Sequence, residues 1–184
     1  LMLTSIPDHA HYNRNFHAGG GNWVTMELRG LASAAVLWPE FREADAWYAY
    51  AFERIVPELE AQVYPDGAQK ELTSSYHRVA MHSFEGLMQL AADAGREAPG
   101  AFRACVERMN QYTAYTISPM GTGPLNHDAD LDDVREEVLK KAAVFGRPDW
   151  AYVASNGRQG KKPEAGPSVV FPWAGHVVFR SGWD

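Results

Sequence analysis

Clusters of basic residues and pairs of cysteines are both absent from this 184-residue sequence. Its 17 Lys and Arg are outnumbered by 23 Asp and Glu, which gives a net charge of −6. No basic run exceeds two residues, so the sequence lacks the basic patch of a nucleic-acid-binding protein. Cys105 has no second cysteine to pair with and no neighbouring Cys-His motif, so we interpret it as a buried helix residue.

Long apolar runs are also missing, and no membrane partner is expected. The opening residues LMLTSIPDHAHYNRNF do not follow the basic-then-apolar order of a signal peptide. The chain begins on Leu1, which suggests a piece of a longer protein. Hydrophobic residues nevertheless make up 46% of the sequence, enough for a globular core.

Apolar residues recur at the spacing of amphipathic helices through most of the chain. His9, His11 and His17 precede these helices in a segment that we expect to be irregular. Asn22 is the expected N-cap of the first helix, Pro39 the first position of the second, and Pro57 a kink within it. The predicted helices are Trp23–Leu37, Pro39 to about Leu59, Ser74–Ala94, Gly100–Tyr115 and Leu131–Phe145.

Turn signals separate these helices from a different pattern at the end of the chain. YPDG, Tyr64–Gly67, has the residues of a tight turn. The Gly-, Lys- and Pro-rich residues 155–167 predict a linker, and the β-branched residues after it predict two short strands. The predicted fold is mainly α, with antiparallel helix pairs over residues 1–154 and the start of a β domain over 168–184.

Two polar residues stand at predicted helix starts. Asn22 presents a side-chain amide where backbone N–H groups favour a carboxylate, and Tyr76 lies in the first turn of another helix, where a phenolate is favoured. In an up-down helical arrangement these two helices run parallel and open at the same end, so one cleft is expected to hold both residues. A plain N-cap and a core aromatic residue fit the same local patterns, so the residues alone leave both interpretations open.

The order of several motifs resembles that of the heparinase II/III-like polysaccharide lyases, a family that includes alginate and oligoalginate lyases. The resemblance extends over nearly the whole chain and is specific only when the motifs are taken together. The motifs are GGGNW, PEF, YPDG, ELTSSYH, LNHDAD and GHVVFRSGWD.

This resemblance implies part of an (α/α) toroid followed by an antiparallel β-sandwich, with the active site between them. The family cleaves uronic-acid polysaccharides by β-elimination and needs no cofactor or metal. Asn22 matches the residue that neutralises the uronate carboxylate, and Tyr76 matches the general acid, which in some members is also the base. An acidic polysaccharide substrate and a periplasmic or secreted location are further implications.

The resemblance also supplies secondary candidates and departures from the family pattern. Trp23 stands where some members have His, so either the role of the base falls to another residue or Trp23 offers a stacking platform to a sugar. A further family histidine lies just beyond the RSGWD motif, where this chain ends, so the chain alone is expected to be inactive without the rest of a β-sandwich domain. The predicted substrate-binding residues are Trp23, His77, Arg78, Glu71 and His17.

The sequence can also be compared with a calcium-binding loop and with two functions other than that of a lyase. A calcium loop beginning at Asp128 fails because Asp133 and Leu139 replace the required Gly and Glu. A glycoside hydrolase on the same toroid would need two carboxylates, for which Glu27 and Glu71 are the candidates. A non-catalytic glycan-binding relative is the third alternative, suggested by Trp23 and the abundance of other aromatic residues.

Overall fold

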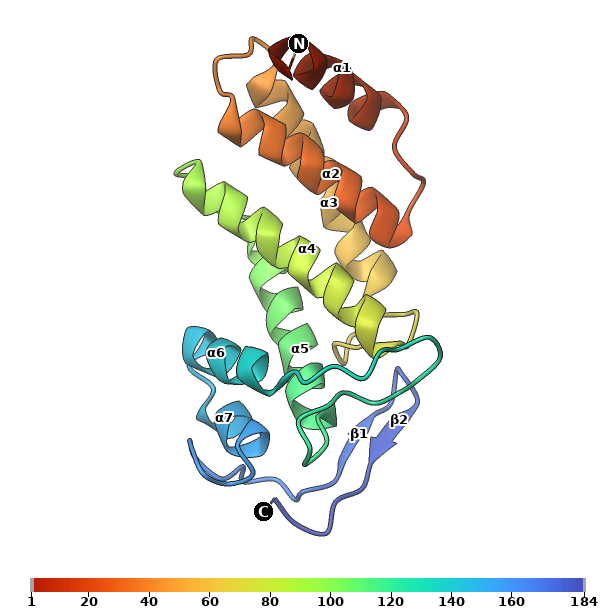
Figure 1. Cartoon of the computed structure of the whole chain (residues 1–184), viewed down its shortest axis with the longest axis vertical. Helices are drawn as coiled ribbons and strands as arrows, with labels where there is room; N and C mark the ends of the chain where they lie inside the picture. The colour runs from red at the N-terminus through yellow and green to blue at the C-terminus, as the bar shows by residue number, and fades with distance from the viewer. Residues whose placement is uncertain (1, 184) are drawn as a thin grey trace. The chain divides into compact units, whose positions relative to one another are not determined.

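A computed structural model describes residues 2–183, which form seven helices and two strands (Figure 1). The elements are α1 (Met2–Asn15), α2 (Gly21–Leu37), α3 (Ala44–Gln62), α4 (Ser74–Asp93), α5 (Gly100–Thr116), α6 (Arg135–Phe145), α7 (Pro148–Ala154), β1 (Val169–Phe171) and β2 (His176–Val178). The fold is therefore mainly α with a closing antiparallel pair of strands, as predicted. None of the helices within residues 2–183 combines the length and apolarity of a membrane span.

The chain divides into two compact units, which are described separately. The first unit contains the residues up to Val63 together with Val79–Cys105. The second contains Tyr64–Arg78 and the residues from Val106 onward. These units do not follow the predicted division at residues 154 and 168, which concerns the domains of a longer protein and stays a prediction.

The first unit is built on the pairing of α2 with α3, and α1 contacts both of them. Buried residues recur every three or four positions, so each helix presents one apolar face to the core. Val24, Leu28 and Leu31 on α2 and Ile55 on α3 are completely buried. Burial of a side chain of this kind contributes about 1.5–3 kcal/mol, so this pairing is the main support of the unit.

The second unit has two small apolar clusters. In one, Trp150 of α7 is buried among residues of α5 and α6. In the other, Phe171 of β1 contacts Tyr112 of α5 edge-on, with the ring centroids 4.8 Å apart. β1 and β2 pair antiparallel with Val170 opposite Val177, so the hairpin closes beside α5.

Four helices besides α2 differ from the prediction. Residues 2–15 form a helix rather than an irregular segment, because packing against α2 and α3 stabilises a sequence with little helical pattern of its own. The second helix begins at Ala44 rather than Pro39, after turns in which Phe41 N–H bonds to Trp38 O. α6 begins at Arg135 because Asp133 pairs with Thr122 in an isolated β-bridge, and the short helix α7 was not predicted.

The YPDG turn is present as predicted, and its glycine meets a tight backbone contact. Gly67 N–H donates to Tyr64 O at 2.9 Å, and Gly67 has a φ of 93°. A Cβ atom at this position would lie 2.1 Å from the carbonyl oxygen of Arg108. Both the dihedral angle and the available space therefore demand glycine.

We expect Gly67→Ala to lower the free energy of unfolding by more than about 1 kcal/mol, because alanine at positive φ is strained and its methyl group would displace backbone. Chemical denaturation monitored by circular dichroism measures the loss. Gly100→Ala is the matched control, since a Cβ atom there would meet nothing within 4 Å. Equal stability of the two variants would contradict the assignment.

Candidate active site

Asn22 is the second residue of α2, in the first unit, and it is half-buried. The prediction that it caps the helix was wrong, because the helix begins at Gly21, two residues before the predicted start at Trp23. Gly20 is extended at the N-cap and Gly21, with a φ of 75°, turns the chain directly into the helix. Asn22 therefore lies in the first turn, where backbone N–H groups lack helical partners.

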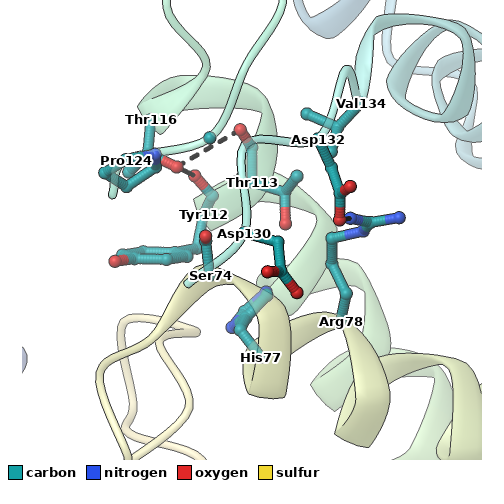
Figure 2. Close-up of a pocket in the computed structure, with 11 residues that line it drawn as sticks. Ser74, His77, Arg78, Tyr112, Thr113, Thr116, Pro124, Asp130, Asp132 and Val134 are labelled. Carbon is teal, nitrogen blue, oxygen red and sulfur yellow. Dashed lines mark hydrogen bonds and ion pairs between the residues drawn. The ribbon is translucent and has the colours of Figure 1, made fainter. Parts of the chain in front are cut away.

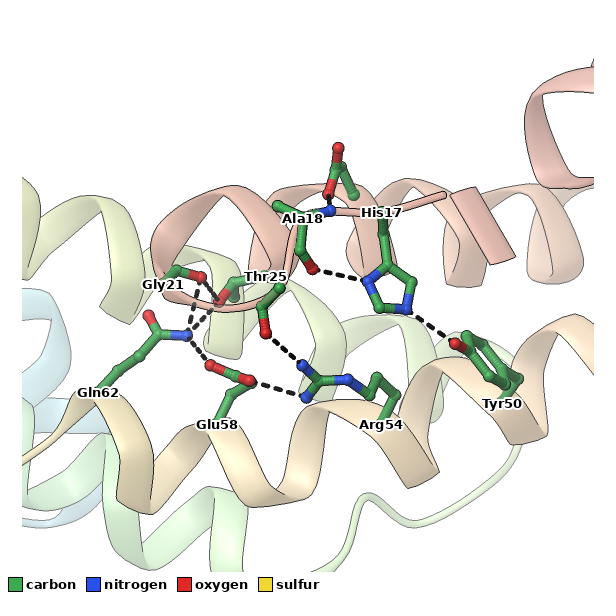
Figure 3. Close-up of polar contacts among 10 residues, drawn as sticks. His17, Ala18, Gly21, Thr25, Tyr50, Arg54, Glu58 and Gln62 are labelled. Atoms are coloured by element: carbon green, nitrogen blue, oxygen red, sulfur yellow. Dashed lines mark hydrogen bonds and ion pairs between the residues drawn. The ribbon is translucent and has the colours of Figure 1, made fainter. Parts of the chain in front are cut away.

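Trp23 and His17 belong to the same unit as Asn22. Trp23 follows Asn22 on α2 and is 70% exposed, so its indole is available to a ligand. His17 lies between α1 and α2 and donates its Nδ1–H to Ala18 O at 2.7 Å (Figure 3). Its Nε2 then accepts from the hydroxyl of Tyr50 at 2.8 Å. Both ring nitrogens of His17 are thus engaged within the protein in this arrangement.

Tyr76 lies in the second unit, in the first turn of α4, as the sequence predicted. The helix begins at Ser74, so Tyr76 is its third residue, and it is half-buried. Like Asn22, Tyr76 therefore lies at a helix start, where backbone N–H groups lack helical partners.

His77, the next residue, is only 3% exposed and bonds to backbone groups. Its Nδ1 accepts from Gln69 N–H at 3.2 Å, and its Nε2 lies 3.1 Å from Met109 O. A carbonyl only accepts, so Nε2 carries the proton and the imidazole is neutral. These bonds hold the segment before α4 against α5, and any contribution of His77 to the site acts through the helix turn that carries Tyr76.

The other two predicted binding residues of the second unit are also paired. Arg78 forms ion pairs with Asp132 at 2.7 Å and Glu137 at 3.2 Å. Glu71 accepts from the side-chain amide of Gln69 at 3.1 Å. Asp132 belongs to the acidic stretch that begins at Asp128, and its ion pair with Arg78 connects that loop to the start of α4.

A small cavity of about 20 Å³ lies beside the first turns of α4 (Figure 2). Its lining includes Ser74 and His77 from α4, Tyr112 and Thr113 from α5, and Asp130 from the loop. This volume holds about one water molecule, whereas ligand sites usually enclose at least about 300 Å³. The cavity is therefore not the position of a saccharide.

Sequence reasoning missed a group of contacts between the YPDG turn, α5 and the β-hairpin. Asp66 accepts from the N–H groups of Trp173 and Ala174 at 2.8 and 3.0 Å. The hydroxyl of Tyr112 lies 2.7 Å from Nδ1 of His176. Burial, followed by the negative charge of Asp66, raises the pKa of Tyr112 to about 12. The only sequence signal was the GHVVF motif, which says nothing about the partner of its histidine.

The predicted site residues are divided between the units: the first contains His17, Asn22 and Trp23, and the second contains Glu71, Tyr76, His77 and Arg78. Each unit carries one of the two candidate catalytic residues in the first turn of a helix. Within residues 2–183 no three His, Cys, Asp or Glu side chains are grouped to hold a metal ion. These features define the chain as a helical domain that carries polar side chains in the first turns of two helices.

Comparison with known proteins identifies the family. The model of the heparinase II/III N-terminus matches residues 1–150, and the chain belongs to this family. A heparin-sulfate lyase of Bacteroides stercoris is 30% identical over 99% of this chain. A heparin-sulfate lyase of Pedobacter heparinus is 30% identical over the whole chain. The chain spans about 28% of the length of each of these relatives.

Solved structures agree with the fold. A heparinase III gene product superposes with a TM-score of 0.81 at 29% identity, covering 99% of this chain and 29% of that one. The heparan sulfate lyase HepC from Pedobacter heparinus gives a TM-score of 0.79 at 30% identity, covering all of this chain and 30% of that one. These are (α/α) toroid proteins, so the expected toroid portion is confirmed.

We predict that His77→Phe lowers the free energy of unfolding by about 1–3 kcal/mol, because it leaves Gln69 N–H buried without its partner and removes one of the donors to Met109 O. Urea denaturation measures the change. His82→Gln, on the exposed side of the same helix, is the control and should be close to neutral. A His77 variant as stable as this control would show that the two bonds are dispensable.

We predict that the free energy of unfolding falls at high pH because of Tyr112 and Tyr115. Burial, followed by a hydrogen bond to Asp149, raises the pKa of Tyr115 to about 12, like that of Tyr112. Tyrosine in the unfolded chain titrates near pH ~10. The contribution of the two neutral phenols to the free energy of unfolding is therefore fully present below that pH, and it is lost as the pH rises from there through about 12. Denaturation at several pH values should show this fall in the parent and a smaller one in the Tyr112→Phe, Tyr115→Phe double variant.

Proposed function

We propose that this chain forms part of a lyase that cleaves a heparan-sulfate-like polysaccharide by β-elimination at its uronic acid residues. The observation that carries the proposal is the match to the heparinase II/III N-terminus over residues 1–150, together with relatives named heparin-sulfate lyases. The first-turn positions of Asn22 and Tyr76 support it, because each lies where a helix start favours negative charge. Periplasmic or secreted action is part of the same proposal.

In the proposed reaction the substrate's carboxylate is the anion that needs neutralising first. The side-chain amide of Asn22 donates to a carboxylate oxygen, and charge that develops there when the C5 proton leaves is stabilised. Such stabilisation is usually the largest single contribution to catalysis. Asn22 is therefore assigned the electrostatic role, and Trp23, which is 70% exposed, is assigned to stack against a sugar ring.

Tyr76 is assigned the proton transfers. The C5–H bond breaks and its proton passes to a base, C4 and C5 form a double bond, and the C4–O4 bond breaks. The O4 leaving group then takes a proton from the phenol of Tyr76. The tyrosine side chain can also serve as the base once ionised, and then returns the same proton to O4, so the proton balance closes on one residue.

The hydrolase alternative draws no support from its two candidate carboxylates. Glu27 accepts from the backbone N–H of Ala18 at 2.7 Å, and Glu71 accepts from Gln69. Each therefore has a local role in holding its own loop. The exposed Trp23 is equally suited to a glycan-binding relative without catalysis, and the experiment below separates that outcome from a lyase.

The test uses the complete gene product with heparan sulfate, heparin, chondroitin sulfate and alginate. Ultraviolet absorbance of the conjugated unsaturated uronate, which elimination produces and hydrolysis does not, should rise with heparan sulfate. Tyr76→Phe should lower kcat by about 100-fold or more, and Asn22→Ala by about 100- to 1,000-fold. Tyr12→Phe, an exposed tyrosine on α1, is the control and should match the parent.

The remaining outcomes assign the alternatives. New reducing ends without absorbance would indicate a hydrolase, and binding with neither signal would indicate a glycan-binding protein. A rise with alginate alone would keep the lyase and change its substrate. Full activity of Tyr76→Phe would remove Tyr76 from the mechanism.

A further inference from the structure

Two polar side chains of α3, Arg54 and Gln62, bond to glycines that precede Asn22, and Glu58 lies between them on the same helix (Figure 3). Arg54, Glu58 and Gln62 are spaced by four residues, so they lie along one face of the helix. Arg54 donates from Nη2 to Gly19 O at 2.8 Å, and Gln62 donates from Nε2 to Gly21 O at 2.9 Å.

Glu58 faces the middle glycine. Its carboxylate oxygens lie 3.7 and 3.8 Å from the position that a Cβ atom of Gly20 would occupy. Arg54 bonds to the first glycine and Gln62 to the last, so one face of α3 holds both ends of the glycine segment.

The same three side chains are bonded to one another. Glu58 accepts from Arg54 Nη1 at 2.7 Å and from Gln62 Nε2 at 2.9 Å. The hydroxyl oxygen of Thr25 on α2 also lies 2.9 Å from Gln62 Nε2, whose two hydrogens are shared among these acceptors. Glu58 and Gln62 are 5% and 4% exposed, and a buried carboxylate is tolerated only when it is paired and hydrogen-bonded.

The glycine segment has little other support of its own. Cβ atoms added at Gly19 or Gly21 would meet nothing within 4 Å, so these two positions are open on the side where a side chain would point. Gly21 is at a φ of 75°, and Gly20 is extended. A flexible backbone of this kind keeps one conformation only if its polar groups are bonded. Here the side-chain hydrogen bonds to its carbonyls come from α3 and from Thr25.

We infer that Arg54, Glu58 and Gln62 are positioning residues, which fix the glycine segment and thereby the direction in which α2 presents the Asn22 amide. This inference rests on the proposed role of Asn22. The pairing has an electrostatic consequence too. Arg54 balances the charge of Glu58, which otherwise would place an uncompensated carboxylate near a helix start assigned to an anionic substrate.

Gln62→Met tests the positioning role, because methionine has a similar length and no hydrogen-bond donor. We expect kcat with heparan sulfate to fall by about tenfold to 100-fold, since small displacements of a catalytic group have effects of this size. KM should change less, because stabilisation of the developing charge is greatest in the transition state. Hydrogen exchange measured by mass spectrometry should accelerate in the peptide that contains Gly19–Trp23.

Arg54→Lys is a second variant in case the buried substitution prevents folding. It keeps the positive charge, but lysine lacks the forked guanidinium that reaches both Glu58 and Gly19. We expect the same faster exchange and a smaller fall in kcat. Ile55→Val is the structural control: it removes a buried methyl group from the same helix, lowers the melting temperature, and should leave kcat and the exchange of this peptide unchanged.

The outcomes separate this inference from the proposed function. Parent-like kcat in folded Gln62→Met and Arg54→Lys, with Asn22→Ala inactive, would overturn the positioning role alone. Parent-like kcat in Asn22→Ala would instead remove the role of Asn22 and the inference with it. A fall in kcat that Ile55→Val reproduces would assign the effect to general stability and overturn the inference.

Discussion

Hydrogen bonds from buried side chains to loop backbone are the constraint on which the candidate site depends. Both candidate catalytic residues lie in the first turn of a helix, so the segment entering that helix decides where they point. Gln62 holds the entry to α2, and His77 holds the entry to α4. Each is almost completely buried, and a lost bond there would cost about 1–3 kcal/mol.

These hydrogen bonds constrain the position of a residue more strictly than apolar packing does. Apolar side chains such as Leu28 and Ile55 hold α2 and α3 together, but apolar packing tolerates many small displacements of one helix along the other. Directional bonds to Gly19 and Gly21 permit far fewer. A catalytic amide needs the second kind of support, because electrostatic stabilisation of a reacting carboxylate depends on the position of the donor.

The tyrosines show how the environment distinguishes one phenol from another. Tyr112 and Tyr115 are kept neutral by burial and by nearby carboxylates, which raise the pKa of each to about 12. A hydroxyl held in this way contributes hydrogen bonds to the fold and is a poor source of protons near neutral pH. Tyr76 differs from them in position, because it is half-buried in the first turn of α4.

Periodicity in the sequence was sufficient for α4, α5, the YPDG turn and the two strands, because their patterns are local and their end signals are clear. The family followed from the order of motifs such as GGGNW and YPDG, and the comparisons confirmed it. Only the tertiary structure decided that residues 2–15 are helical, that Asn22 is inside α2, and that His77 is buried. These depend on contacts between residues far apart in the chain, such as Gln62 with Gly21, which no local pattern encodes.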